Sequence, residues 1–313
     1  MKKTTRNLVT GGAGFLGSHL IDQLIKKGED VICIDNFSTG SKKNLEHLEN
    51  NKKIKIIDHD ITKEINIEID QIWHLACSGS PKFFYTHPIE IAKTNFLGTY
   101  NMLRLAKNLN AKILLASSSE IYGNPKVHPQ SEDYEGSVNN IGKRSCYEEG
   151  KRIAETLCFD FNRKYKCDIK VARIFNTYGP RILPNDGRVI SNFIFQAISN
   201  MPLTIYGDGF QTRSFCYVDD LIQGLILLMD SNFKGPVNLG NPNELKIVEL
   251  AEIIRSKINP RLEFKKLKLP KDDPMRRKPV IDLAIKELNW EPKISLDLGL
   301  DRTIDYFLNK LKK

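Results

Sequence analysis

The sequence predicts an α/β fold, in which a doubly wound parallel sheet carries a smaller, interleaved lobe in the C-terminal half. Three observations predict this class. Short continuous apolar runs alternate with amphipathic helical patterns up to residue 175, which is typical of strands covered by helices on both faces. The first apolar run ends in a glycine-rich turn that opens a helix. After residue 176, turn signals such as YGPR, YGDG and NLGNPNE become dense, which indicates a change of architecture.

Each element follows from its pattern. We expect the first strand at 5–12 and a helix over FLGSHLIDQLIKKG, which has apolar residues at helical spacing and ends at Gly28. Further strands of the sheet are predicted at 30–35, 53–58, 71–76, 112–117 and 169–175. Helices are predicted at about 89–108 and 147–165, and then at 188–200, 219–230 and 247–258. A late strand at 236–240 could return to the main sheet.

Composition restricts the class of protein. The 313 residues carry a net charge of +9, spread along the chain except for KKLKLPKDDPMRRK at 265–278. No apolar run approaches the ~20 residues that span a bilayer, and the first residues lack the apolar core of a signal peptide. Six cysteines without a Cys-x-x-Cys or Cys/His cluster favour reduced thiols in a cytoplasmic protein, with no metal site and no disulfide framework. We expect no membrane or nucleic-acid partner, and small anionic ligands for the arginines inside motifs.

The glycine-rich turn has the pattern of a dinucleotide site. In TGGAGFLG, Gly12, Gly14 and Gly17 fit G-x-G-x-x-G, and Gly11, Gly14 and Gly17 fit the variant G-x-x-G-x-x-G. Such glycines let the backbone approach a pyrophosphate at a helix N-terminus. Asp35 ends the second strand, and its carboxylate suits the ribose hydroxyls of NAD and repels a 2′-phosphate. The sequence therefore predicts a Rossmann-type NAD site, the alternative being a glycine turn without a ligand.

This site sets the predicted domains. Residues 1–175 would form the NAD-binding Rossmann domain, to which 215–240 return, and 176–214 with 241–313 would form the substrate lobe. Asp60, at the end of the third strand, is a candidate adenine contact or a turn carboxylate.

A second cluster lies at the end of the strand KILLA and on the next helix. Tyr147 and Lys151 are four residues apart, so they share one face of a helix. A lysine ammonium near a phenol is expected to lower the pKa of the tyrosine, which could then act as a base. The stretch ASSSEIYG adds Ser118 or Ser119, which could hydrogen-bond the hydroxyl that such a base would deprotonate, and Glu120 as a carboxylate.

Together these motifs resemble a known family. The glycine loop, DNFSTG, ASSSEIYG, the Tyr147/Lys151 pair and RIFNTYGPR resemble the extended short-chain dehydrogenase/reductases. Within them, HPQSEDY, DGRVISNFI, LTIYGDGFQTRSFCYVDDL, NLGNP and DDPMRRKP are similar to the UDP-glucuronate decarboxylases, or UDP-xylose synthases, of the NAD-dependent epimerase/dehydratase family, over about residues 6–311. The resemblance implies NAD as cofactor, oxidation of UDP-glucuronate at C4, loss of CO₂ from the 4-keto sugar, re-reduction to UDP-xylose, and a homodimer through helices near 95–108 and 147–165.

The resemblance also implies site residues. The implied catalytic residues are Tyr147, Lys151, Ser118, Ser119, Glu120 and Arg277. The implied NAD-binding residues, besides Tyr147 and Lys151, are Gly11, Gly14, Phe15, Leu16, Gly17, Asp35, Asn36, Ser38, Thr39, Gly40, Asp60, Ile61, Leu75, Cys77, Thr94, Ala116 and Thr177. The implied substrate-binding residues are Lys93, Asn176, Arg181, Arg188, Val189, Asn192, Tyr206, Gln211, Arg213 and Arg277. Each of these could instead have an ordinary structural role.

Three residues decide the expected chemistry: Ser119, Glu120 and Arg277. Related 4,6-dehydratases resemble Thr-Asp-Glu where this chain has Ser118-Ser119-Glu120. A serine in place of that aspartate avoids a like-charge clash with a substrate carboxylate. The negative charge of Glu120 is expected to repel the substrate carboxylate and so to favour its loss as CO₂. Arg277 is expected to face that carboxylate bidentately, although Arg276 could take its role, and a phosphate clamp or a surface charge is the alternative.

The chain departs from the family pattern in two loops. Ser78 and Gly79 stand where a Pro and an Ala are usual, and Glu135 and Asn140 stand where a Trp and a Pro are usual. These departures affect the expected loop rigidity and fine substrate preference. The alternatives left open are a UDP-sugar 4-epimerase or 4,6-dehydratase, a decarboxylase that releases the 4-keto pentose, and a non-catalytic NAD-sensing or RNA-associated protein.

Overall fold

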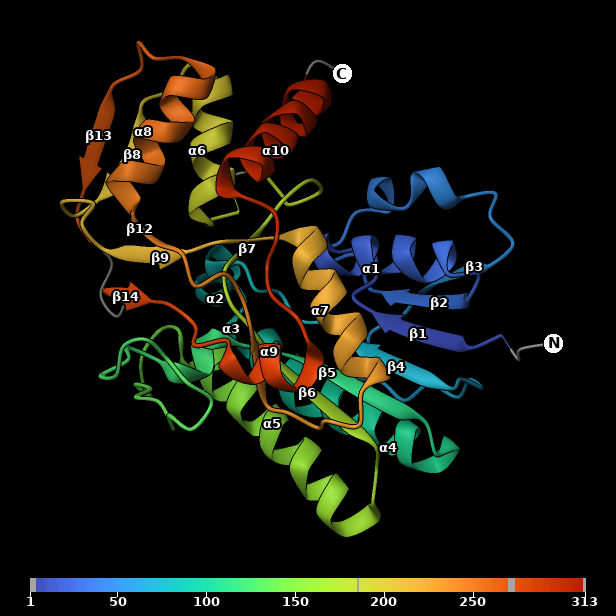
Figure 1. The fold of residues 1–313 in the computed structure, drawn as a ribbon. Coiled ribbons are helices and arrows are strands. Elements are labelled where there is room, and N and C mark those ends of the chain that lie inside the picture. The colour runs from blue at the N-terminus through green and yellow to red at the C-terminus, as the bar shows by residue number, and fades with distance from the viewer. Residues whose placement is uncertain (1–3, 185, 270–273, 312–313) are drawn as a thin grey trace.

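The computed structural model describes residues 4–184, 186–269 and 274–311. A seven-stranded sheet lies at its centre (Figure 1), in the order β11-β6-β5-β4-β1-β2-β3, and all its pairings are parallel. Its strands are β1 Arg6–Thr10, β2 Asp30–Asp35, β3 Ile54–Asp58, β4 Gln71–His74, β5 Lys112–Ser118, β6 Ile169–Ile174 and β11 Val237–Leu239. The order runs away from β1 in both directions, which places a ligand crevice beyond the carboxyl ends of β1 and β4. The predicted fold class is confirmed.

Helices cover both faces of the sheet. Figure 1 shows α1 Phe15–Lys26 and α7 Val218–Asp230 on one face, and α4 Thr99–Leu109 and α5 Ser145–Tyr165 on the other. Successive strand residues point to opposite faces, so Leu8 packs toward α4 and α5 whereas Val9 packs toward α1 and α7. Strands buried on both faces need continuous apolar runs, which is why the sheet could be recognised in the sequence.

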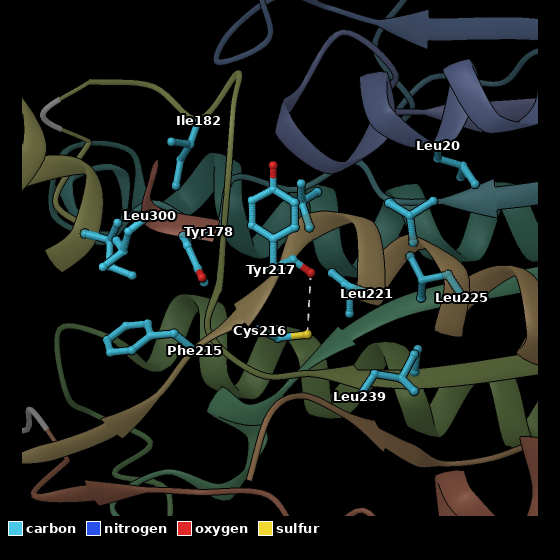
Figure 2. Close-up of a cluster of buried hydrophobic side chains, with 14 of the residues drawn as sticks. Leu20, Tyr178, Ile182, Phe215, Cys216, Tyr217, Leu221, Leu225, Leu239 and Leu300 are labelled. Atoms are coloured by element: carbon cyan, nitrogen blue, oxygen red, sulfur yellow. Dashed lines mark hydrogen bonds between the residues drawn. The ribbon is translucent and has the colours of Figure 1, made fainter. Parts of the chain in front are cut away.

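The core on the α1/α7 face continues into the lobe. Figure 2 shows Leu20 of α1, Leu221 and Leu225 of α7, and Leu239 of β11 in one cluster with residues of the lobe, including Leu300. This shared apolar core fixes the lobe over the carboxyl ends of the strands.

The lobe is built from helices and small sheets. Its helices are α6 Val189–Ile198, α8 Ile247–Ile258 and α10 Leu296–Leu311. Its strands are β8 Leu203–Tyr206 with β13 Phe264–Leu267, β9 Thr212–Ser214 between β12 Glu244–Lys246 and β14 Arg276–Arg277, and β7 Thr177–Tyr178 with β10 Cys216–Tyr217. The remaining elements are α2 Pro81–Thr86, α3 Pro88–Lys93, the π-helical turn Thr94–Gly98, α9 Asp282–Leu288 and the 3₁₀ turns Lys42–Asn44, Glu46–Leu48 and Ser119–Tyr122.

Some expected elements differ in detail. The helix predicted at 89–108 consists of α3 and α4, joined by the π-helical turn at 94–98, because wider i→i+5 pairing inserts a local bulge. The first strand ends at Thr10, since Gly11 has a φ of 69° and turns the chain. The late strand β11 pairs with β6 in the main sheet, while the boundaries of the two domains stay a prediction. None of the helices in the described part of the chain combines the length and hydropathy needed to cross a membrane.

Candidate active site

A cavity of about 1130 Å³ lies between the carboxyl ends of the strands and the lobe. It is lined by the glycine turn, by the ends of β2, β4 and β5, by α5, and by the start of α6. Every site residue expected from the sequence lines it except Arg277. The fold therefore gathers these residues in one place, while their contacts with ligands stay predictions.

The glycine turn forms a cradle that side chains would fill. A Cβ on Gly11 would lie 2.9 Å from Cα of Ala76, and a Cβ on Gly17 would overlap the carbonyl oxygen of Gly11. Helix α1 begins at Phe15, directly after this turn, so its unpaired N–H groups face the cavity end of the sheet. This is the geometry that a dinucleotide pyrophosphate requires.

Asp35 is held at the end of β2. Its carboxylate accepts hydrogen bonds from the backbone N–H groups of Ala13, at 3.0 Å, and Phe37, at 2.8 Å. Burial raises its pKa, and the two backbone bonds oppose that effect. Asp60 also lines the cavity, and its carboxylate accepts a hydrogen bond from the N–H of Thr62 at 2.9 Å. It therefore acts as a turn carboxylate, one of the two roles expected from the sequence, while the adenine contact stays a prediction.

Tyr147 and Lys151 lie on the first turns of α5, facing the end of β5. The phenol stacks on the ring of Phe84 at 4.6 Å and hydrogen-bonds to Ser118. The ammonium of Lys151 donates to the carbonyl of Ala116 at 2.8 Å and lies 5.7 Å from the centre of the Tyr147 ring. The predicted helix face and the predicted serine are thus brought together.

The expected lowering of the tyrosine pKa by Lys151 is wrong. Burial raises the pKa of Tyr147, and the neighbouring Cys77 and Glu120 raise it further, whereas Ser118 and Arg188 lower it. Burial also lowers the pKa of Lys151. The physical reason is that both groups are almost fully enclosed, so the cost of removing their charged forms from water exceeds their mutual attraction.

Glu120 follows β5 in a 3₁₀ turn and forms two ion pairs. Its Oε2 lies 2.5 Å from Nη2 of Arg144 and 3.7 Å from Nη2 of Arg277. Burial alone would raise its pKa, but Arg277 and Arg144 together lower it to about 2. The carboxylate is therefore ionised and largely compensated, which moderates the expected repulsion of a substrate carboxylate.

Arg144 was missed in the sequence. It precedes α5 and lines the cavity, and its Nε also donates to Glu148 at 3.1 Å. The signal was a basic residue three positions before Tyr147, but Lys143-Arg144 in a polar loop has the pattern of a solvated surface.

Arg277 lies behind Glu120 and does not line the cavity. It is 1% exposed, and its guanidinium donates to the carbonyls of Ser119 and, at 2.8 Å, Gly123. The expectation that it faces the cavity directly is not met, because strand β14 directs it under the 3₁₀ turn. Its burial also excludes a surface charge, and Arg276 is exposed.

The lobe contributes further side chains. Gln211 is buried and donates to the carbonyl of Tyr206 at 2.9 Å, and Arg181 lies 2.7 Å from Asp22 of α1. Arg188 lies 3.5 Å from Asp186. Asp186 and Ser80 also line the cavity and were missed, since neither carries a pattern in the sequence. In the described residues, no three His, Cys, Asp or Glu side chains converge as a metal site, and the six cysteines are free.

Comparison with known proteins decides the family. Residues 7–240 match the model of the NAD dependent epimerase/dehydratase family. The chain belongs to this family. Its cofactor is NAD, and the cradle of glycines with Asp35 fits that dinucleotide.

Curated relatives within the family are similar over almost the whole chain. The chain is 53% identical to UDP-glucuronic acid decarboxylase 1 of Arabidopsis thaliana over 310 residues, which covers 99% of this chain and 71% of the relative. It is 51% identical to UDP-glucuronic acid decarboxylase 1 of Xenopus tropicalis, with coverage of 99% and 74%.

Solved structures of the family share the fold at lower identity. A UDP-glucose 4-epimerase of Thermotoga maritima, solved with UDP-glucose, has a TM-score of 0.91 and 30% identity, with coverage of 98% of this chain and 99% of that one. A UDP-glucuronic acid 4-epimerase of Bacillus cereus, solved with UDP-glucuronic acid and NAD, has a TM-score of 0.88 and 29% identity, with coverage of 97% and 99%.

Proposed function

We propose that this enzyme decarboxylates UDP-glucuronate to UDP-xylose through a UDP-4-keto intermediate. The observation that carries the proposal is the identity of 50% or more to curated UDP-glucuronic acid decarboxylases of plants and vertebrates over 94–99% of the chain. The 4-epimerases share the fold at only about 30% identity. NAD, held by the glycine cradle and Asp35, would supply the hydride chemistry at C4.

Tyr147 is the proposed base for the C4 hydroxyl. Its phenol lies in the cavity beside Ser118, which can hydrogen-bond the same hydroxyl and so orient the proton for transfer. Lys151, anchored on the carbonyl of Ala116, lies 5.7 Å from the centre of the tyrosine ring and is proposed to help hold the cofactor beside it.

Ser119, Glu120 and Arg144 are the proposed surroundings of the reacting carboxylate. Oxidation at C4 makes the C6 carboxylate part of a β-keto acid. CO₂ leaves when the C5–C6 bond breaks, the bonding pair passes into an enolate, and the enolate takes a proton at C5 before C4 is reduced again. Glu120 lines the same cavity and is ionised. Of the two arginines that pair with Glu120, Arg144 lines the cavity and Arg277 does not. We propose that Arg144 meets the substrate carboxylate, and that Arg277 acts by holding Glu120 and the turn at 119–123. Glu120→Gln should slow decarboxylation more than it weakens binding.

The nucleotide is proposed to lie along the lobe. Tyr206, Gln211 and Arg213 line the lobe side of the cavity, where amide and guanidinium groups suit a uracil and a diphosphate. Lys93, Asn176, Arg181, Val189 and Asn192 complete the proposed substrate contacts.

The test is incubation with UDP-glucuronate and NAD⁺, following CO₂ and the nucleotide sugar. Release of CO₂ with formation of UDP-xylose is expected. Accumulation of the UDP-4-keto pentose with reduced cofactor would instead identify a decarboxylase that releases this intermediate before the final reduction at C4. An inverted C4 with C6 intact would identify a 4-epimerase and overturn the proposal. UDP-glucose serves as the neutral control substrate, which should not be converted.

We also propose a homodimer in the cytoplasm. Apolar side chains lie exposed along the face formed by the turn at 94–98 and helices α4 and α5: Phe96, Leu97, Tyr100 and Ile153, at 38–45% exposure. Such a patch on two neighbouring helices supports pairing with a second copy of the chain. The free cysteines are consistent with a reducing compartment.

A further inference from the structure

The loop between β4 and α2 meets the loop before α6 at the cavity wall. Ser80 is buried, and its hydroxyl donates to the backbone carbonyl of Asp186. The first loop follows a strand of the central sheet, and the second opens a helix of the lobe. This hydrogen bond therefore joins the two parts of the molecule beside the candidate active site.

Asp186 organises its own loop. Its side chain is buried, and Oδ1 accepts hydrogen bonds from the N–H of Arg188 and the hydroxyl of Ser191, both at 3.0 Å. Its other oxygen, Oδ2, lies 3.5 Å from Nη1 of Arg188. The carboxylate thus fixes both the backbone and the guanidinium of the same arginine.

Gly79 shows where that guanidinium points. A Cβ built on Gly79 would lie 3.2 Å from Nη2 of Arg188 and 3.5 Å from the hydroxyl oxygen of Tyr147. The guanidinium and the phenol therefore face the same point of the cavity wall. Because Gly79 has no side chain, the space between the two groups is open at this point.

We propose that Asp186 is a positioning residue, which holds the guanidinium of Arg188 beside the phenol of Tyr147 and thereby favours loss of the phenolic proton. Ser80 keeps the Asp186 loop against the sheet, so the arginine reaches the phenol from the lobe. The inference deepens the proposed function, on which it rests only in that Tyr147 is the base.

The other charged groups around the phenol do not favour loss of its proton, so this effect is assigned to Arg188. Glu120 and the thiol of Cys77 raise the pKa of Tyr147, as burial does most strongly. Lys151 directs its ammonium at a backbone carbonyl. Among the neighbouring cations, Arg188 lowers the pKa of the phenol.

The pH dependence of kcat/KM distinguishes two effects of Asp186: its positioning of Arg188, and the direct effect of its own negative charge on Tyr147. Asp186→Asn keeps an oxygen for the two hydrogen bonds at the start of α6 but loses the ion pair. Removing a negative charge near Tyr147 would by itself lower the tyrosine pKa and move the acidic limb down. Loss of positioning predicts the opposite, an upward shift of about one pH unit and about tenfold less activity on that limb.

Arg188→Gln should give the same upward shift, and Arg188→Lys should restore part of it. In the Arg188→Gln background, Asp186→Asn should cause no further upward shift, because the arginine it positions is gone. Arg302→Gln, which removes an ion pair with Asp219 at 3.6 Å outside the cavity, is the matched control and should leave the profile unchanged.

Hydrogen–deuterium exchange tests the loop contact without turnover. Ser80→Ala should speed exchange in both 77–81 and 186–188, whereas Arg302→Gln should not. Unchanged exchange in either loop, or an unchanged or downward acidic limb for Asp186→Asn, overturns the inference while CO₂ release by the unmodified enzyme stands. Absence of CO₂ release overturns the proposed function instead. In that case the acidic limb of the kcat/KM profile is measured with an epimerisation or dehydration assay, because both reactions begin with the same C4 oxidation.

Discussion

The carboxylate of Glu120 lies 2.5 Å from the guanidinium of Arg144, which precedes the helix carrying Tyr147. Glu120 comes from the end of β5, so this ion pair joins the two segments that carry the proposed catalytic residues at the cavity wall. Arg277 supports the same carboxylate from behind, at 3.7 Å. The ionisation of Glu120 and the position of its carboxylate therefore both depend on these two arginines.

Arg144→Gln is expected to lower kcat/KM by tenfold or more, since truncating one partner of an enclosed ion pair leaves the other poorly compensated. The pKa of Glu120 should rise toward its ordinary value, which flattens the dependence of the free energy of unfolding on pH between pH 5 and 3. Arg255→Gln is the matched control, because Arg255 lies 2.5 Å from Glu252 in the lobe and does not line the cavity. An unchanged slope in Arg144→Gln would show that Arg144 does not control the pKa of Glu120.

Glu120 should make the protein less stable in acid. Its pKa in the folded chain is about 2, below the ordinary value of 4.5, so its stabilising effect is complete above about 4.5 and is lost as the pH falls toward 2. The corresponding slope of the free energy of unfolding is about 1.4 kcal/mol per pH unit. Denaturant unfolding between pH 5 and 3 should show this slope flattened in Glu120→Gln and kept in Glu68→Gln, a change at an exposed ion pair. Equal slopes in both variants would contradict the pairing.

Gly17→Ala should abolish tight NAD binding, because its Cβ would overlap the carbonyl oxygen of Gly11 and distort the cradle. We expect at least a tenfold weaker affinity in a calorimetric titration, together with a lower Tm. Gly28→Ala is the control. It has a φ of 82° with nothing within 4 Å of the added Cβ, so it should cost only about 1–2 kcal/mol of backbone strain and retain the affinity. Equal affinity in both variants would argue against the cradle.

Ile153→Asp should dissociate the proposed dimer, since it places a charge in the apolar face of α5. Sedimentation velocity should show the monomer at concentrations where the unmodified chain is dimeric. Leu298→Asp, a similarly exposed position on α10, should leave the dimer intact. A monomeric unmodified chain, or a dimeric variant, would place the interface elsewhere.

The sheet could be predicted because strands buried on both faces have an unmistakable composition. DVICID forms β2 over the expected residues, and KILLAS extends by one residue to Ser118. The helix at 89–108 was predicted as continuous, because a π-helical turn leaves the apolar periodicity nearly unchanged. Local pattern therefore located the elements but not the irregularity within one of them.

The candidate site was predictable where it depends on local spacing. Tyr147, Lys151 and Ser118 meet because a helix and a strand end bring them together. Arg277 and Arg144 depend on long-range packing instead. The direction of each guanidinium is set by where β14 and the loop before α5 pass the turn at 119–122, which a linear pattern does not contain.

The strand order has a consequence for synthesis of the chain. Strand β6 receives its outer neighbour only from residues Val237–Leu239, more than sixty residues downstream. Until the ribosome has delivered that segment, the nascent polypeptide displays an apolar strand with unsatisfied peptide groups along one side, a surface prone to mispairing. Shielding by a chaperone would be most valuable during this interval of translation.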